Sequence, residues 1–445
     1  MLKMNAPPAT TNERPCDRKH WQLIDKTWRN NSNSDYTETL KALSQSFRYE
    51  ACCDRYWSDP EVSLLYGTPL YEAATETQRL ALNHLYWLTL YQGVAATEVG
   101  AMLYNQITAG VFQAMGGYDT LCQELLLETA QEKQHIRAFH KICTKTRQAL
   151  LGKTPIGSSH QAQSKRHFGA DLAINVQSAA LRLLAKGMLR NYASYYSPYL
   201  AELERKNQSI PVPTYGIAGQ TGSEVLLRFF TINFGLSPFL ASQSFSVRLL
   251  SNILVKAQEH CYSKYFLELD KRGETPPIPT SISRYHFLDE SFHLAISQAI
   301  GVGMPQDFPP PSQYEKFVGN QIFHNVQKNL LSGLSGVLPS RFVPDTCNFM
   351  MFFYKILRSP IFEFPAEDAL HWLERCFCND HEGFQVTLKY HKRLLAEMRR
   401  IFSPLDYLQP ANREFRVMVA GGSLERTLQR NQQTFQQFSR SLAVT

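Results

Sequence analysis

The stretch Tyr285–Ser297, which reads YHFLDESFHLAIS, decides how the chain is expected to fold. His286, Glu290 and His293 occupy positions i, i+4 and i+7, so on an α-helix their side chains fall within about 60° of one face. Phenylalanine and leucine residues surround this polar stripe, which predicts a helix buried on more than one side. Unpaired imidazoles and a carboxylate are costly inside a core, and a bound metal cation would use all of them. A solvent-exposed helical face is the alternative interpretation.

The same spacing occurs earlier, in the segment ETAQEKQH, where Glu128, Glu132 and His135 again lie at i, i+4 and i+7. A Glu-x-x-His pair, present at Glu290 with His293, therefore occurs a second time in the chain. Each pair places two metal-ligand types on one face of a helix. An exposed acidic helix is the alternative interpretation of the earlier pair.

Helical periodicity predicts two long helices around this earlier pair, over 76–115 and 120–151, joined by a Gly-Gly turn. Two helices joined by so short a connection pack antiparallel. At about 1.5 Å of rise per residue, Glu98 on the first helix and Glu132 and His135 on the second lie roughly 22–27 Å from the turn. The sequence therefore predicts that these three side chains lie at one level.

A second pair of helices is predicted over 238–271 and from Thr280 or Ser281 onward, separated by the proline-rich ETPPIP. Glu259 lies on the first of these helices. The polar stripe of the second helix lies within about four turns of its start, so Glu259 is expected at the same level. Glu224, at the start of a short predicted helix, is a rival for the ligand position of Glu259.

Together these helices supply the pattern of a dinuclear metal site. Di-iron carboxylate bundles take one Glu from each of two helices and a Glu-x-x-His pair from each of the other two. The side chains that match are Glu98, Glu132, His135, Glu259, Glu290 and His293, with His286 one turn before Glu290. Carboxylates and imidazoles suit iron, so two iron ions are expected, with a manganese–iron pair as the alternative and O2 as co-substrate. Asp289 could orient a ligand histidine or lie exposed.

No strand alternation persists in the chain, so the predicted fold is all-α, a ferritin-like four-helix bundle core with additional N-terminal, inserted and C-terminal helices. We expect a flexible leader over 1–35, a helical-bundle domain over 36–306 with an insertion at 153–221, and a helical extension over 307–445. The extension could pack on the same domain as a lid, a dimer surface or a docking region. Further helices are predicted over 37–56, 170–206, 224–235, 313–335, 345–357, 366–399 and 412–440.

Composition narrows the classes of function. The net charge of +7 is spread along the 445 residues in short clusters, so no nucleic-acid partner is expected. The most apolar run, NFMMFFY over 348–354, is too short to cross a bilayer, so no membrane partner is expected either. The nine cysteines show no disulfide spacing and the N-terminus lacks an apolar signal region, which predicts a cytoplasmic location. Cys376, Cys378 and His381 lack a clear fourth zinc ligand, so chance is the favoured explanation of that motif.

The sequence resembles the p-aminobenzoate N-oxygenase type of diiron arylamine oxygenases over about residues 75–300. The resemblance lies in ETAQEKQH, in HFLDESFH with its additional His286, and in the interval of 27 residues from Glu259 to His286. It implies a ferritin-type bundle with a third histidine at the metal centre and O2-dependent oxidation of an amine nitrogen. The ligands it implies are Glu98, Glu132, His135, Glu259, His286, Glu290 and His293.

The predicted function is therefore that of a cytoplasmic diiron oxygenase acting on a small-molecule substrate, with N-oxygenation of an amine as the expected reaction. A reductase or ferredoxin is the expected electron donor, and a homodimer is compatible with the sequence. One alternative is a diiron enzyme that hydroxylates, desaturates or cleaves at carbon. A non-enzymatic ferritin-like iron-binding protein and a metal-free helical scaffold are further alternatives.

Overall fold

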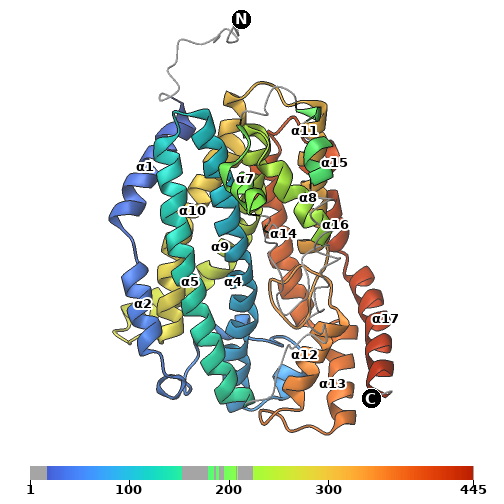
Figure 1. Ribbon diagram of the computed structural model, residues 1–445. Coiled ribbons are helices and arrows are strands. Elements are labelled where there is room, and N and C mark those ends of the chain that lie inside the picture. The colour runs from blue at the N-terminus through green and yellow to red at the C-terminus, as the bar shows by residue number, and fades with distance from the viewer. Residues whose placement is uncertain are drawn as a thin grey trace, which may run out of the picture.

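The structure is a computed structural model that describes residues 18–152, 179–184, 187–189, 195–206, 208 and 224–443. Every regular element among these residues is a helix and none is a strand, which confirms the all-α prediction. Four long helices lie side by side through the molecule (Figure 1). They are α4 (Glu76–Met115), α5 (Asp119–Leu151), α9 (Pro238–Lys271) and α10 (Ile278–Gln298). The relationship of these helices to ferritin-like bundles stays a prediction.

Local chemistry fixes the ends of the antiparallel hairpin formed by α4 and α5. A capping box starts α4: the Thr75 hydroxyl accepts a hydrogen bond from the Gln78 backbone amide, and the Gln78 side chain accepts one from the Thr75 amide. The helix ends at Gly116, whose φ of +75° is unfavourable for residues with a side chain. Because only three residues separate α4 from α5, the chain turns straight back on itself.

The helix α4 is apolar along most of its length, and this places its one central charge inside the protein. Its charged residues are Glu76 and Arg79 in the first turn and Glu98 in the middle. Glu98 is 5% exposed. A buried carboxylate on an apolar helix needs compensation from neighbouring helices, so α4 contributes to an interior site.

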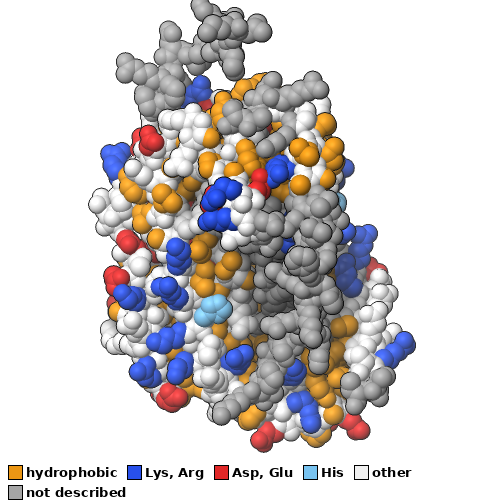
Figure 2. Space-filling view, in the orientation of Figure 1, with side chains coloured by type: hydrophobic (Ala, Val, Ile, Leu, Met, Phe, Trp, Pro, Cys, Tyr) orange, Lys and Arg blue, Asp and Glu red, His pale blue; other side chains and the backbone are white. Residues whose placement is uncertain are grey.

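The helix α5 is amphipathic, and its two faces explain its position. Lys133, Arg137 and Lys145 are exposed on its outer side, where Figure 2 shows scattered Lys and Arg side chains. Glu132 and His135, on the opposite face, are buried. The inner face of α5 therefore points its titratable groups at the other three long helices.

Tight packing fixes α10 against α9. Ser237 caps α9 with its hydroxyl, and Pro238 follows at the first helical position, where proline is favoured. At its other end α10 continues into a π-helical turn, η5 (Ala299–Gly303). A Cβ at Gly301 would lie 2.7 Å from the Ser246 backbone nitrogen, so only glycine permits this approach to α9.

Two N-terminal helices cover the outer side of α5 and α10 (Figure 1). They are α1 (Lys19–Asn33) and α2 (Thr37–Ser46). The prediction of a flexible leader over 1–35 is wrong for α1, because this mostly polar helix buries one face through Ile24 and Asn31. Polar residues on that face hid the helical pattern.

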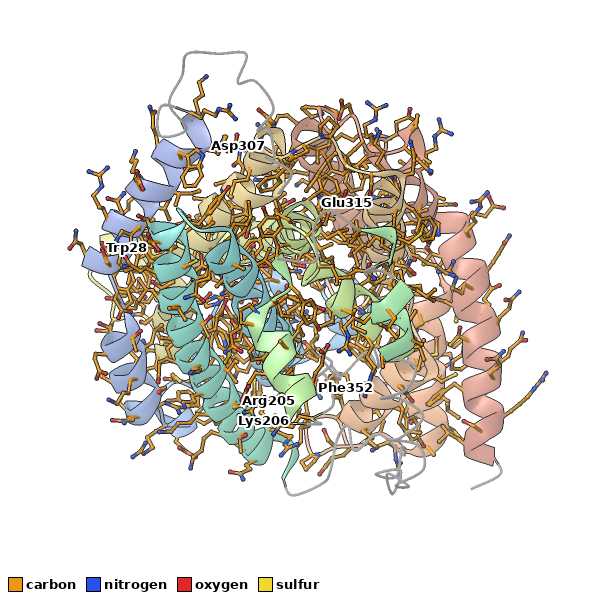
Figure 3. All side chains as sticks on the ribbon, turned by 45° about the horizontal axis from the view of Figure 1, so that its top comes forward. Trp28, Arg205, Lys206, Asp307, Glu315 and Phe352 are labelled. Carbon is orange, nitrogen blue, oxygen red and sulfur yellow. The ribbon has the colours of Figure 1, made fainter. Side chains whose placement is uncertain are left out.

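Asp307 ties the start of α1 to the end of the short helix η6 (Met304–Asp307), and Figure 3 labels it beside that end of α1. Its carboxylate accepts a hydrogen bond from Arg18, lies 2.7 Å from His20 Nε2 and lies 2.9 Å from Trp21 Nε1. Three side chains at one carboxylate hold α1 in place over the four long helices.

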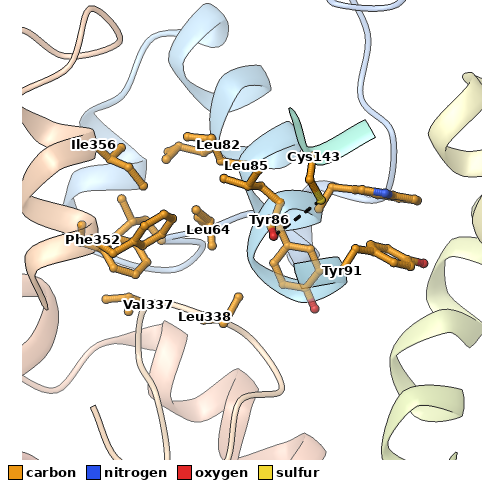
Figure 4. Close-up of a cluster of buried hydrophobic side chains, with 14 of the residues drawn as sticks. Leu64, Leu82, Leu85, Tyr86, Tyr91, Cys143, Val337, Leu338, Phe352 and Ile356 are labelled. Carbon is orange, nitrogen blue, oxygen red and sulfur yellow. Dashed lines mark hydrogen bonds between the residues drawn. The ribbon is translucent and has the colours of Figure 1, made fainter. Parts of the chain in front are cut away.

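The C-terminal extension packs on the same body. Its helices are α11 (Gln313–Leu330), α12 (Cys347–Leu357), α13 (Ala366–Cys378), α14 (Glu382–Phe402), α15 (Pro410–Arg413), α16 (Arg416–Gly421) and α17 (Leu424–Ala443). Phe352 and Ile356 of α12 share one hydrophobic cluster with Leu82 and Leu85 of α4 (Figure 4). The extension and the bundle are therefore joined by a common core, while their division into separate domains stays a prediction.

The remaining elements are η2 (Tyr49–Ala51), η3 (Pro60–Val62), α3 (Pro69–Ala73), α7 (Pro198–Arg205) and α8 (Glu224–Phe234).

Several predicted helices have other bounds in the structure than the sequence predicted. The helix predicted over 37–56 ends at Ser46, where the chain turns to bury Phe47. The helix predicted over 366–399 is interrupted at residues 379–381. The helix predicted over 412–440 is interrupted at 414–415, where Phe415 has a φ of +53°, and at 422–423. The helix predicted over 170–206 lies partly outside the described residues. Within the described part, no helix combines the length and apolarity needed to cross a membrane.

Candidate metal centre

The structure brings the seven predicted side chains into one buried region between the four long helices. Glu98 comes from α4, Glu132 and His135 from α5, Glu259 from α9, and His286, Glu290 and His293 from α10. None is more than 7% exposed. The levels predicted by counting residues along antiparallel helices are therefore those that the structure shows.

Four of these side chains form a first group whose potential ligand atoms all lie within 4.8 Å of one another: Glu98, His135, His286 and Glu290. His286 Nε2 lies 2.9 Å from Glu98 Oε1 and 3.6 Å from Glu290 Oε1. His135 Nδ1 lies 4.0 Å from Glu98 Oε1. Two imidazoles and two carboxylates thus converge on one point.

A second group consists of Glu132, Glu290 and His293, whose ligand atoms lie within the same 4.8 Å limit. His293 Nδ1 lies 2.8 Å from Glu290 Oε1 and 3.4 Å from Glu132 Oε1. Glu290 belongs to both groups. Two adjoining sets that share one carboxylate suit a pair of ions with a bridging ligand.

Glu259 lies behind the first group and contacts it through His286. Its Oε1 atom is 2.6 Å from His286 Nδ1 and 2.9 Å from the Tyr91 hydroxyl. Glu259 therefore orients His286 so that Nε2 faces Glu98. The side chain of the rival ligand Glu224 lies outside the described ones, and the assignment of all seven residues as metal ligands stays a prediction.

A family comparison identifies the kind of protein that carries this site. The model of a family described as acyl halogenase CylC-like matches residues 19–439. The chain belongs to the CylC-like acyl halogenase family. Neither the comparison with curated proteins nor the comparison with solved structures found a match.

Membership of the CylC-like family corrects one prediction and supports a broader one. The resemblance to the p-aminobenzoate N-oxygenase type of oxygenase is wrong. It rested on two Glu-x-x-His pairs and an additional histidine, which reflect what two metal ions require and carry no information about the substrate. The broader expectation of an oxidative enzyme with a buried Glu/His cluster able to bind metal agrees with the family and the geometry.

The donor set of this CylC-like protein fits metal ions on two structural grounds. One oxygen each of Glu98 and Glu259 is buried and has no hydrogen-bond partner among the described residues. Such orphaned carboxylate oxygens are costly unless a cation binds them. In addition, four buried glutamates lie together, and two divalent cations would neutralise all four. The expectation that these ions are iron stays a prediction.

Without metal, protons bound to the histidines and to Glu98 supply positive charge among the buried carboxylates. Burial raises the pKa of Glu98 to about 7. Burial and the neighbouring His286 lower the pKa of His135, yet hydrogen bonds to Asp289 and Glu132 raise it to about 9. Burial likewise lowers the pKa of His293, but Glu290 above all raises it to about 10. Metal ions must therefore displace protons from this site.

The residue before each motif glutamate orients the histidine of the other motif. Asp289 Oδ2 lies 3.0 Å from His135 Nε2, and Gln131 Oε1 lies 3.3 Å from His293 Nε2. Asp289 is 0% exposed, so the alternative of an exposed carboxylate is wrong. Each histidine is thereby held with Nδ1 toward the centre, one by an anion and the other by a neutral amide.

Two polar residues that were not predicted from the sequence, Asn31 and Asn252, also support the centre. Asn31 on α1 donates a hydrogen bond of 2.7 Å to Glu124 Oε1 and accepts one of 2.8 Å from Gln131 Nε2. Asn252 donates 2.7 Å to Glu290 Oε2. Asn31 lies in the segment predicted to be a flexible leader, and Asn252 is an uncharged residue of α9. The spacing of metal-ligand residues therefore gave no signal for either of them.

Glu128, which shares a helical face with Glu132, does not join either metal group in the described residues. It pairs instead with buried Arg248, whose Nη1 lies 2.5 Å from Glu128 Oε2 and 2.9 Å from Asn105 Oδ1. Arg248 lies on α9 three helical turns before Glu259, on the same side of that helix. That register is the signal that could have identified it.

The cysteine and histidine motif of α13 forms no metal group in the described residues. Cys376 and Cys378 are buried, and His381 Nε2 lies 2.7 Å from the Cys376 backbone oxygen. His381 is thus engaged in a local turn, and the interpretation of the motif as chance stays a prediction.

Proposed function

We propose that this protein is a dinuclear iron halogenase that replaces a C–H hydrogen of an acyl substrate by halogen, using O2 and a halide ion. The observation that carries the proposal is the pair of buried ligand groups sharing Glu290, in a chain of the CylC-like acyl halogenase family. The family description supplies the acyl substrate and the halogen. The overall reaction consumes one O2, one halide, two electrons and three protons, and yields the halogenated product and two waters.

The chain's own residues prepare the site for this reaction. Bound iron ions would supply the capacity to activate O2 and to oxidise a C–H bond. Glu98, Glu132, His135, His286, Glu290 and His293 are the side chains that would hold them, and the second oxygen of Glu259, which has no hydrogen-bond partner among the described residues, would complete the set. Asp289, Gln131 and Glu259 fix the three imidazoles through the ring nitrogen that faces away from the centre.

Aromatic residues close one side of the site against water. The Phe139 ring lies 4.8 Å from the His286 ring, and Tyr91 packs 4.1 Å from Phe139. All three rings are buried. Exclusion of water matters because water at the centre would compete with halide and lead to hydroxylation of the same carbon.

The experiment is product analysis with bromide. Metal-free protein is loaded with ferrous iron under nitrogen, its iron content is measured, and O2, a chemical reductant, bromide and a panel of fatty acids and acyl thioesters are added. We expect about two irons per chain and an acyl product with the isotope pattern of bromine. His293→Ala should lose both, while Lys133→Ala, an exposed change on the same bundle, should retain both.

Two outcomes would contradict the proposal. A hydroxylated or desaturated acyl product without bromine would keep the metal centre but assign a different carbon oxidation. Wild-type protein that takes up no iron would remove its basis. Amine N-oxygenation rested on the resemblance that the family comparison overturns.

A further inference from the structure

A line of aromatic rings runs from the metal centre toward the surface. Tyr91 stacks on Trp87 with 4.8 Å between ring centroids and an interplanar angle of 21°. Trp87 meets Trp57 edge-on at 6.1 Å, and Trp57 meets Tyr49 edge-on at 5.9 Å. The first three side chains are fully buried, whereas Tyr49 is partly exposed. Four oxidisable rings in contact therefore connect the interior with solvent.

The inner end of this line touches a predicted metal ligand. The Tyr91 hydroxyl donates to Glu259 Oε1 at 2.9 Å and lies 2.7 Å from Ser283 Oγ. The Tyr91 ring lies 6.4 Å from the ring of His286. An electron and a proton that leave Tyr91 thus have separate acceptors within contact distance, since Glu259 lies in hydrogen-bond reach of the phenol.

The outer end has its own proton acceptor. The Tyr49 hydroxyl lies 3.0 Å from His84 Nδ1, and His84 Nε2 lies 2.9 Å from the Arg55 backbone oxygen. Because a backbone oxygen can only accept, Nε2 carries the imidazole proton and Nδ1 is free to accept one. Burial lowers the pKa of His84 to about 4, so this imidazole is neutral near pH 7.

We propose that Tyr49, Trp57, Trp87 and Tyr91 form an electron path along which a one-electron reductant in solution reduces the oxidised metal pair. This inference rests on the redox-active metal centre of the proposed function and is independent of halogenation. A tyrosine loses an electron readily only when its proton leaves as well, and each tyrosine of the line has a base at its hydroxyl. The tryptophans between them need no such partner to pass an electron.

Each step balances. Tyr91 would give one electron to a bound, oxidised metal pair and its proton to Glu259. Trp87 would then reduce Tyr91, which would regain that proton. Trp57 reduces Trp87, and Tyr49 reduces Trp57 while its proton moves to His84 Nδ1. A reductant such as ascorbate finally supplies an electron to Tyr49, and His84 returns the proton. The net change is one electron moved from the reductant to the metal pair.

A neighbouring branch of tyrosines shows what the path requires. Tyr262 lies 4.7 Å from Trp87, as close as Tyr91, and Tyr86 lies 6.2 Å from Tyr262. The Tyr262 hydroxyl is buried with no base within hydrogen-bond distance among the described residues, and Tyr86 is 1% exposed. This branch has ring contact, but among the described residues Tyr262 has no proton acceptor, and its last ring, Tyr86, is buried, so it lacks both features of the line from Tyr91 to Tyr49.

Core packing alone does not explain the residue types in the line. The same hydrophobic cluster contains a second aromatic group, around Phe349, Phe353 and Phe377, in which the rings also meet edge-on at 5.0–6.1 Å. Phenylalanine thus satisfies the packing in that part of the core. In the line from Tyr91 to Tyr49 the rings are instead tryptophan and tyrosine, the two aromatic side chains that can be oxidised by one electron.

The experiment follows radicals in iron-loaded protein without substrate or halide. Protein with ring-deuterated tyrosine or tryptophan is mixed with O2, freeze-quenched and measured by electron paramagnetic resonance, and oxidised Tyr49 is then sought by peptide mass mapping. Wild-type protein should show a tyrosine radical and oxidised Tyr49. Trp87→Phe should lose the Tyr49 product and prolong the radical at Tyr91. The matched control Tyr262→Phe, which changes the other tyrosine in contact with Trp87, should behave as wild type.

A surface variant keeps the test decisive if Trp87→Phe does not fold. Tyr49→Phe leaves the buried rings in place and should abolish acceleration of radical decay by ascorbate. The proposal is overturned if iron-loaded wild type forms no protein radical, if Tyr49 is oxidised equally in Trp87→Phe, or if Tyr262→Phe has the same effect as Trp87→Phe. Because halide and acyl substrate are absent, failure of halogenation would leave these results unaffected.

Discussion

Loading the metal-free centre with two divalent ions should release about three protons per chain at pH 8. His135, His286 and His293 must be neutral to bind metal. In the metal-free chain the pKa of His135 is about 9 and that of His293 about 10, and the carboxylates of Glu259 and Glu98 outweigh burial to raise the pKa of His286 well above its ordinary value. At pH 8 His135 and His293 are therefore roughly nine-tenths protonated or more, and the raised pKa of His286 favours its protonated form as well.

The number of released protons can be measured by isothermal titration calorimetry under nitrogen. Ferrous or cobaltous ions are titrated at pH 8 in two buffers with different ionisation enthalpies, and the difference between the apparent binding enthalpies gives the proton count. Apparent affinity should also rise with pH between 7 and 9, by up to about tenfold per pH unit for each proton displaced.

Asp289→Asn provides the matched variant, because it keeps the shape of the side chain but removes the anion 3.0 Å from His135 Nε2. The pKa of His135 should fall toward its ordinary value, and the release at pH 8 should drop by about one proton. Binding enthalpies that do not depend on the buffer would refute the reasoning, because they would mean that no imidazole gives up a proton to the metal.

Three further predictions concern buried residues outside the set of candidate metal ligands. Burial depresses the pKa of His84 to about 4 in the folded state, so the contribution of His84 to stability is present above about pH 6.5 and is lost as the pH falls. In urea unfolding between pH 7 and pH 5, the free energy of unfolding of metal-free wild type should fall by about 2 kcal/mol more than that of His84→Gln. An equal fall in both proteins would contradict this. Asn31→Ala removes the hydrogen bonds that Asn31 makes with Glu124 Oε1 and Gln131 Nε2, both buried. The free energy of unfolding should therefore fall by about 1–3 kcal/mol, whereas unchanged denaturation would show that water replaces Asn31. Gly301→Ala forces a Cβ to within 2.7 Å of the α9 backbone and should cost about 1–3 kcal/mol, measured as a lower Tm; an unchanged Tm would show that α10 can shift freely.

The long helices could be predicted from sequence because each carries its own local signals. The bounds of α4 follow from the Thr75 cap and the glycine pair after Met115, and those of α9 from Pro238 and the basic end of the helix. Helix α1 was missed because its buried face includes Thr27 and Asn31, which look like exposed positions. Their burial depends on partners such as Glu124 on another helix, which no local pattern reveals.

The candidate ligands could be identified because metal binding requires fixed residue types at helical spacing. Asn31 and Asn252 could not be identified, since they have ordinary neighbours in the sequence and gain their roles only through contacts across the bundle. The family was misjudged for a related reason. Glu-x-x-His pairs describe how two ions are held, and enzymes with different substrates meet that requirement with the same residues.

The most direct test of the account is a crystal structure of the iron-loaded protein with anomalous scattering measured at the iron edge. We predict two anomalous peaks per chain, about 3.5–4 Å apart, with Glu290 between them and with His135 and His293 each bound through Nδ1 to a different iron. A single peak, peaks outside the space between α4, α5, α9 and α10, or an iron-loaded chain in which Glu290 contacts no metal would contradict the central claim.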